Sequence, residues 1–243
     1  MADEVSIRVN FAKPIALFPL DSLAILPQQV IPLHIFEARY RQMVDRALDS
    51  AGQIAMAVYE GDGWRDNYDG NPPLKPFVCV GQIVQHERLP DGRYNILLQG
   101  VCRARIAEEL VPEDDRATPA EPARLFREAM LEPVGLEAGD ETHLQSLRDW
   151  VTQQLQHGPL NKLAMADQVL EYVENDAIPA EAVVELVSFA LLTDEDTRYR
   201  LLSEPDADAR IRVVREELGA LARLIRDAGA QHPEDWPKGL SWN

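Results

Sequence analysis

The sequence has none of the long apolar segments that mark membrane proteins. Its most apolar N-terminal run, residues 15–33, is interrupted by Pro19, Asp21, Pro27 and Pro32, whereas a spanning helix needs roughly 18–20 uninterrupted apolar residues. Acidic residues stand near the N-terminus where a signal peptide would carry basic ones. We therefore expect neither a membrane protein nor one exported by an ordinary signal.

Basic residues and cysteines are also scarce. Against 41 acidic residues stand only 24 basic ones, which gives a net charge of −17 over 243 residues. A field of this sign repels phosphate backbones, so we expect no nucleic-acid partner. Both cysteines, Cys79 and Cys102, lie in apolar runs and cannot build a disulfide framework. They are expected to be buried, reduced thiols of a cytoplasmic protein.

Sequence motifs for catalysis are absent. The chain contains no G-x-x-x-x-G-K-[ST], G-x-S-x-G, H-E-x-x-H or paired C-x-x-C motif, and its five histidines are scattered. We therefore predict no enzyme, no catalytic residue, no metal and no cofactor. Cys102 and His86 would form a nucleophilic pair across a hairpin only if the thiol were exposed, whereas the strand context predicts packing. Two-carboxylate hydrolysis is neither supported nor excluded.

The first half of the sequence has the pattern of strands joined by turns. A three- and four-residue spacing of apolar side chains interrupts it once and predicts a helix over residues 37–48. Asp91-Gly92 lies between two apolar runs, which is typical of a hairpin. The segment from Glu60 to Pro76 is predicted to be a long loop. Strands are expected over residues 15–20, 30–33, 54–59, 77–86, 94–100, 101–106 and 128–133.

The second half has helical periodicity. Pro179 occupies a first-turn position, and Thr193 with Asp196 resembles a capping box. About five helices are expected here, ending near Arg226. The predicted organisation is a β-rich subdomain over residues 1–136, a helical bundle over 137–228 and an irregular tail over 229–243.

Two blocks of the sequence resemble a known family. The first comprises residues 17–20 (LFPL), 26–27 (LP) and 31–40 (IPLHIFEARY). The second comprises residues 80–83 (VGQI), 89–100 (LPDGRYNILLQG) and 103–106 (RARI). Their order and spacing resemble the LON substrate-binding domain, the N-terminal domain of the ATP-dependent Lon protease, over roughly residues 14–226.

The resemblance implies an α+β fold, in which a PUA-like β pseudobarrel precedes the all-helical subdomain. It also implies a substrate-recognition module without the ATPase and protease domains that follow in Lon. Unfolded or apolar peptide segments are then the expected partners, with a separate protease or ATPase as a further partner.

Five residues are candidates for substrate contact. Trp64 and Tyr68 lie on the long loop, where aromatic side chains supply binding area. Phe36, Arg39 and Tyr40 belong to the first block. For each set a structural alternative stays open, since the loop can fold back on the barrel and aromatic residues at helical spacing usually pack in a core. Arg103 and Arg105 lie on one strand face and could grip carboxylates, but a solvated face or local salt bridges are expected for them.

Other functions stay open beside peptide binding. The helical half would form the interface of a homodimeric scaffold, or an unrecognised pocket would bind a small molecule or serve an enzyme. An apolar groove between barrel and helices is an alternative binding surface to the loop. RNA binding is suggested only by the PUA-like architecture, and the charge opposes it.

Overall fold

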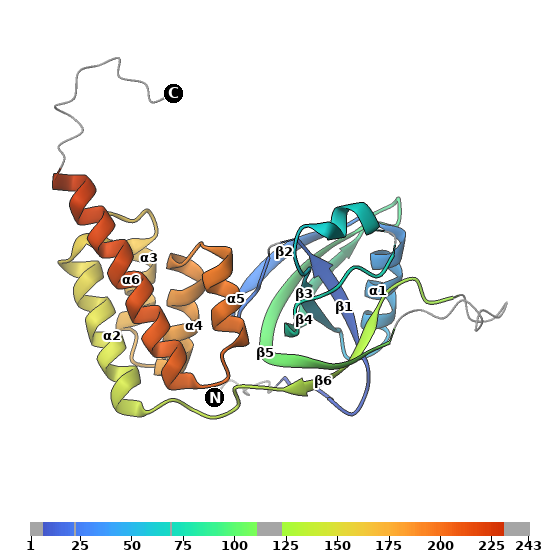
Figure 1. Ribbon diagram of the computed structural model, residues 1–243, viewed down its shortest axis with the longest axis horizontal. Helices are drawn as coiled ribbons and strands as arrows, with labels where there is room; N and C mark the ends of the chain where they lie inside the picture. Colours follow the sequence, from blue (N-terminus) through green and yellow to red (C-terminus); the bar gives the residue numbers. More distant parts are fainter. Residues whose placement is uncertain (1–6, 22, 69, 111–122, 231–243) are drawn as a thin grey trace, which may run out of the picture. The chain divides into compact units, whose positions relative to one another are not determined.

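A computed structural model describes residues 7–21, 23–68, 70–110 and 123–230. It confirms the expected α+β class, with a six-stranded sheet followed by helices (Figure 1). Internal contacts divide the chain into two units. The β unit comprises residues 1–136 and 194–205, and the helical unit comprises residues 137–193 and 206–243.

The β unit is built on a sheet that closes on itself. Its strand order is β2-β5-β4-β3-β1-β6, and β5 also pairs with β6. Five strands therefore form a ring, which β2 extends as an edge strand. β1 and β3 are parallel, and the other pairs are antiparallel. The strands are β1 (Ile15–Leu20), β2 (Val30–Ile35), β3 (Gln53–Val58), β4 (Phe77–Arg88), β5 (Tyr94–Leu110) and β6 (Glu128–Pro133).

The interior of the ring is filled by small and branched apolar side chains. Leu17, Ala55, Val80 and Ala104 belong to this core and are fully buried. Helix α1 (Ala38–Leu48) packs against β1 and β3 and buries its own apolar side. The apolar periodicity of α1 is thus explained by burial on one side of the helix, whereas β3 buries residues on both of its faces.

The hairpin of β4 and β5 turns at Gly92, which has a φ of +81° that favours glycine. The two runs expected over residues 94–106 form the single strand β5. In its register Cys102 lies opposite Val80, whereas His86 lies opposite Ile96. The strand register therefore does not bring Cys102 and His86 together, and burial raises the pKa of the Cys102 thiol to about 11.

The close approach of another backbone segment explains why position 100, in the second block, is a glycine. A Cβ atom at this position would lie 2.3 Å from the carbonyl oxygen of Leu26. The Gly100 amide donates to the Gln29 carbonyl over 2.8 Å, and the Gln28 amide donates to the Gly100 carbonyl over 2.9 Å. A glycine here lets the segment before β2 lie directly against β5.

Helix α5 (Glu195–Ser203) belongs to the β unit, although the sequence analysis placed it in the helical bundle. The Phe77 amide donates to the Tyr199 hydroxyl oxygen over 3.0 Å. Arg103 Nε donates to the Leu201 carbonyl oxygen over 3.1 Å. Arg103 is therefore buried, with 5% exposure, and the expected solvated face is wrong for this arginine. Arg105 is exposed and pairs with Glu132 at 2.6 Å.

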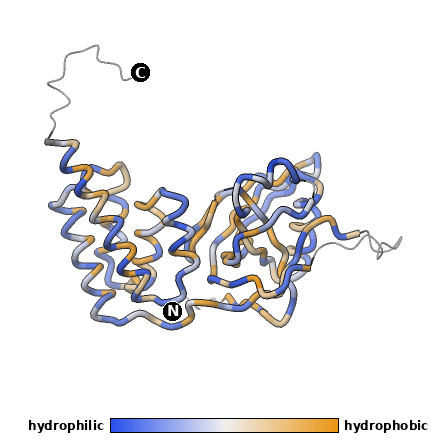
Figure 2. Tube along the Cα trace, viewed as in Figure 1, coloured by the Kyte–Doolittle hydropathy of each residue, from blue (hydrophilic) through white to orange (hydrophobic). Residues whose placement is uncertain are grey.

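The helical unit contains four α-helices and a 3₁₀ helix among its described residues. Its helices bury apolar side chains on one side, which Figure 2 shows as an alternation of hydrophobic and hydrophilic residues along each helix. Within the described ranges no helix is both long and apolar enough to cross a membrane. The elements are α2 (Glu141–Gln156), η3 (Pro159–Lys162), α3 (Ala166–Glu174), α4 (Ala180–Leu191) and α6 (Ala207–Ala230).

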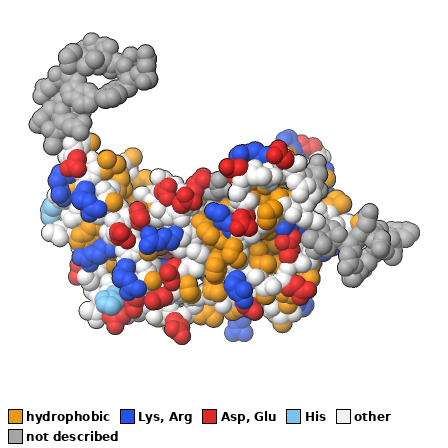
Figure 3. Space-filling view, in the orientation of Figure 1, with side chains coloured by type: hydrophobic (Ala, Val, Ile, Leu, Met, Phe, Trp, Pro, Cys, Tyr) orange, Lys and Arg blue, Asp and Glu red, His pale blue; other side chains and the backbone are white. Residues whose placement is uncertain are grey.

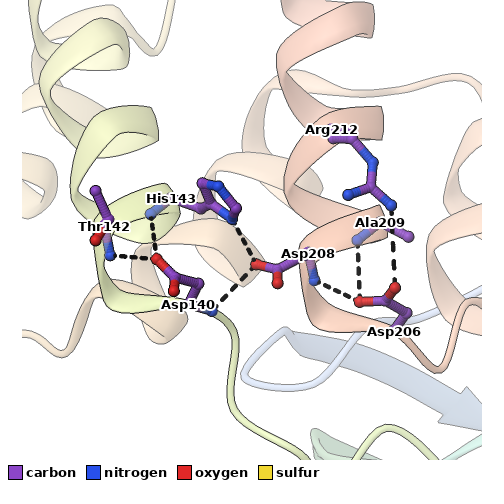
Figure 4. A network of polar contacts seen from close by, with 7 residues as sticks. All are labelled: Asp140, Thr142, His143, Asp206, Asp208, Ala209 and Arg212. Carbon is purple, nitrogen blue, oxygen red and sulfur yellow. Dashed lines mark hydrogen bonds and ion pairs between the residues drawn. The ribbon is translucent and has the colours of Figure 1, made fainter.

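Aspartates cap and join the N-termini of α2 and α6 (Figure 4). Asp140 accepts from the backbone amides of Thr142 and His143 over 2.8 and 3.2 Å. Asp208, on the first turn of α6, accepts from the Asp140 amide and from His143 Nδ1, each over 3.1 Å. Asp206 caps α6 through the amides of the next turn. The two helix starts are thereby tied together.

We expect Tyr199→Phe to lower the free energy of unfolding by about 1–2 kcal/mol, because the Phe77 amide would lose its acceptor. Chemical denaturation would measure the change. Tyr172→Phe, on the half-exposed face of α3, is the matched control and should change stability by less than about 0.5 kcal/mol. Equal stability of the Tyr199 variant and the wild type would contradict the contact between α5 and β4.

We expect Asp140→Asn to lower the melting temperature at pH 7 and to have no effect at strongly acidic pH. The backbone amides of His143 and Thr142 lower the pKa of Asp140. The stabilisation from its charge is therefore present above the unfolded pKa and is lost as the pH falls through the folded pKa. Circular-dichroism melts from pH 7 to pH 2 would test this, with the exposed Asp149→Asn as control. A pH-independent difference would contradict the charge effect.

Candidate functional site

The first block of the sequence forms the end of β2 and the first turn of α1. Glu37 is the N-cap residue of α1, with an extended backbone. Its carboxylate accepts from the Tyr68 hydroxyl over 2.6 Å and lies 3.5 Å from Arg39 Nε. The Arg41 guanidinium, on the same turn, donates to the Asp91 carbonyl over 3.4 Å. The helix start is thus tied to the long loop by Glu37 and to the β4–β5 turn by Arg41.

The long loop folds back on the β unit through its aromatic side chains. It contains the 3₁₀ helix η1 (Gly63–Asn67). The Trp64 ring stacks on Tyr59 with centroids 4.8 Å apart and planes 6° apart, and it lies 5.9 Å from the Tyr68 ring. The Arg39 guanidinium lies over the Tyr68 ring at 4.9 Å, a cation–π contact. These contacts hold the loop against the first turn of α1.

A pocket of about 380 Å³ opens beside this cluster, and we call it the tyrosine pocket. Tyr40, Tyr59 and Tyr68 contribute to its wall together with Arg39. Arg124 and Arg127 line it as well, but both already bind carboxylates. Arg127 binds Glu109 through two nitrogens and donates to the Pro72 carbonyl over 2.8 Å; Arg124 donates to Glu128 over 2.6 Å.

The hydroxyl groups of the tyrosine pocket hold their protons at neutral pH. Burial raises the pKa of Tyr40 and of Tyr59 above the ordinary value. Burial, together with the hydrogen bond to Glu37, raises the pKa of Tyr68 to about 12. The pocket therefore presents neutral hydroxyls and paired guanidiniums, a polar surface without an ionised base among its tyrosines.

Phe36 lies outside this cluster. Its side chain is 59% exposed and stacks on His34, with ring centroids 6.3 Å apart. Val30, Pro32 and His34 precede it at alternate positions of the edge strand β2, and Val30 is 49% exposed. Residues at a spacing of two share one face of a strand. We call Val30, Pro32 and Phe36 the apolar stripe.

The neighbouring strands continue the surface of the apolar stripe. Leu97 of β5 pairs with Pro32 in the strand register, and Gln85 of β4 pairs with Leu97. These residues line an open hollow of about 360 Å³. Val84, 47% exposed, lies at the irregularity of β4 next to Gln85. The stripe is therefore part of a wider, partly apolar sheet face.

The structure brings four of the five predicted contact residues together and separates the fifth. Arg39, Tyr40, Trp64 and Tyr68 meet at the tyrosine pocket and its loop, while Phe36 lies on the apolar stripe. Sequence reasoning missed Tyr59, Glu37 and Arg127 as members of the cluster. Tyr59 carries a usable signal, an aromatic residue between an apolar strand and a long loop. No local signal marks Arg127.

The comparisons with known proteins agree with this architecture. A family model described as the ATP-dependent protease La (LON) substrate-binding domain matches residues 14–219. The chain belongs to the LON substrate-binding domain family. The matched range includes the apolar stripe, the tyrosine pocket and all helices up to the middle of α6.

Curated relatives of this family member are Lon proteases. The Lon protease of Geobacter metallireducens is 27% identical over 214 residues, which cover 86% of this chain and 24% of that protein. The Escherichia coli K12 Lon protease is 31% identical over 93 residues, which cover 38% of this chain and 12% of that protein. The chain thus spans about a quarter or less of these relatives.

Solved structures show the same fold. The N-terminal domain of the Mycobacterium avium complex Lon protease aligns with a TM-score of 0.61 and 19% identity, covering 84% of this chain and 97% of that one. A Lon N-terminal domain protein from Xanthomonas campestris aligns with a TM-score of 0.53 and 20% identity, covering 86% and 98%.

We expect alkaline pH to reveal the raised pKa of the part-buried Tyr68 hydroxyl. A folded pKa of about 12, above the ordinary value near 10, gives stability that is present below pH 10 and is lost as the pH rises towards 12. Urea unfolding between pH 9 and pH 12 should therefore show a less steep loss of stability for Tyr68→Phe than for the wild type. Equal slopes would contradict the raised pKa of Tyr68.

Proposed function

We propose that the protein is a non-catalytic module that binds exposed apolar segments of protein chains through the apolar stripe. The family and the Lon N-terminal fold support substrate recognition in general. The observation that carries the proposal is the exposure of Val30 on the edge strand β2 and of Phe36 directly after its end. Contiguous exposed apolar patches mark binding sites, and Pro32 lies between these two side chains on the apolar stripe.

The geometry of β2 favours an extended ligand. β5 pairs with one side of β2, and β2 ends the sheet order. Pro32 has no backbone N–H, so backbone pairing along this edge is interrupted. We therefore expect the affinity to come from apolar side-chain contacts, with Phe36 as the central contact residue.

The tyrosine pocket has a supporting role in this proposal. Its arginines are engaged in ion pairs, and its tyrosines stay protonated at neutral pH. Trp64, Tyr68, Arg39 and Tyr40 contact one another and hold the loop, which favours positioning over direct contact with substrate. The proposal includes a cytoplasmic location and a protease or ATPase that processes the bound chain, by analogy with the Lon proteases.

Fluorescence polarisation of labelled, unfolded casein tests this function. We expect micromolar binding by the wild type and at least tenfold weaker binding by a Val30→Ser, Phe36→Ser double variant, a loss of about 1.4 kcal/mol or more. Leu224→Ser is the matched control, since Leu224 is 66% exposed on α6 of the helical unit. Circular dichroism would verify that each variant keeps its fold.

The outcomes of this experiment separate the candidate surfaces. If the Val30→Ser, Phe36→Ser variant bound casein as tightly as the wild type, the assignment of the binding surface to β2 would be overturned. If a Trp64→Ala, Tyr68→Ala variant then bound more weakly, the contact surface would be the loop. No casein binding up to about 100 µM protein, a free energy weaker than about −5.5 kcal/mol, would overturn free-standing substrate capture.

A further inference from the structure

The helical unit carries an open hollow of about 580 Å³ where α2 ends. Its wall comes from the last turn of α2, from η3 and from the C-terminal part of α6. His157, Lys162 and Arg226 supply basic side chains to this wall. Figure 3 shows Lys, Arg and His side chains close together near the C-terminal end of α6. We call this feature the basic hollow.

The charge of the basic hollow contrasts with that of the protein. None of its described lining residues is Asp or Glu, although acidic residues outnumber basic ones by 41 to 24 in the chain. Within the described part of the chain, neither Lys162 nor Arg226 forms an ion pair or hydrogen bond. By comparison, Arg105, Arg124 and Arg127 in the β unit all bind carboxylates. Two cations beside one cavity thus have no counter-charge among the described residues.

The local backbone directs these cations to one place. At the C-terminal end of α2 the Gly158 amide donates to the carbonyls of Gln153 and Gln154 over 3.1 Å each. The chain then turns into η3. A Cβ atom at Gly229 would lie 3.0 Å from Lys162 Nζ, so the ammonium group lies against the last turn of α6. Arg226 precedes Gly229 by three residues and shares its side of the helix.

Neutral donors complete the wall. The side chains of Gln153, Gln154 and Asn161 line the basic hollow beside the three basic residues. Their amide groups can donate hydrogen bonds to an oxyanion. The cavity is larger than a single phosphate group needs and is open to solvent, so a chain of linked phosphates fits it with one end outside.

We propose that the basic hollow binds the phosphate chain of a small molecule, a di- or triphosphate group. Several cations acting on one multiply charged anion add up, whereas a single exposed ion pair contributes only about 0–1 kcal/mol. The net charge of −17 opposes the approach of anions at long range, but salt screens it beyond about 8 Å at physiological ionic strength. The local cations therefore determine binding, and this site is independent of the apolar stripe.

Isothermal titration calorimetry with sodium tripolyphosphate tests the proposal. We expect saturable one-to-one binding at physiological ionic strength that weakens as more salt is added. A Lys162→Gln, Arg226→Gln double variant should bind at least tenfold more weakly. Arg212→Gln is the matched control, because Arg212 is an exposed cation on the same helix, outside the basic hollow, and should leave the affinity unchanged.

Two further ligands identify what is recognised. If adenosine triphosphate binds with the affinity of tripolyphosphate, the site recognises the phosphate chain alone. If it binds more tightly, the nucleoside also contributes to the affinity. Both results support the site. Citrate that binds as tightly as tripolyphosphate would overturn the choice of phosphate. Absence of binding at millimolar ligand, or an equal loss in the Arg212 variant, would overturn the site. The casein experiment is unaffected by any of these results.

Discussion

The pairing of β5 with three other strands is the constraint on which the β unit depends. This strand has 17 residues, and it pairs with β2 and β4 along its first half and with β4 and β6 along its second. The pairing with β6 closes the ring, and the pairing with β2 leaves that strand at the edge. Arg103, near the middle of β5, holds α5 through the Leu201 carbonyl. The apolar stripe and the docking of α5 therefore share one scaffold.

Much of this fold could be predicted from the sequence, because its signals are local. Asp91-Gly92 predicts the hairpin through the positive φ that glycine tolerates, and the spacing of Tyr40, Met43, Val44 and Ala47 predicts α1. The assignment of α5 could not be predicted this way. Its helical pattern is the same whether it packs on helices or on β4, and only the long-range partners Phe77 and Arg103 decide.

The candidate site shows the same limit. Its aromatic residues were identifiable by type and by their place on a loop, but their partners were not. The Tyr59 ring stacks on Trp64, 5 positions further along the sequence. The Glu37 carboxylate accepts a hydrogen bond from the Tyr68 hydroxyl, 31 positions away. Contacts of this kind depend on how the long loop folds back on the β unit. These contacts also distinguish the tyrosine pocket, whose side chains contact one another, from the apolar stripe, whose side chains are exposed to water.

The place of α5 has a consequence for the architecture of the chain. The polypeptide leaves the helical unit at residue 194, adds a helix to the β unit and returns at residue 206. The two units are therefore joined by three covalent crossings, and neither is one continuous segment. A cut near residue 137 would produce an N-terminal fragment that lacks α5, so that the Phe77 amide loses the Tyr199 hydroxyl and Arg103 Nε loses the Leu201 carbonyl. Because each unit consists of two chain segments, the exchange of either unit for another domain requires more than one pair of chain ends to be rejoined.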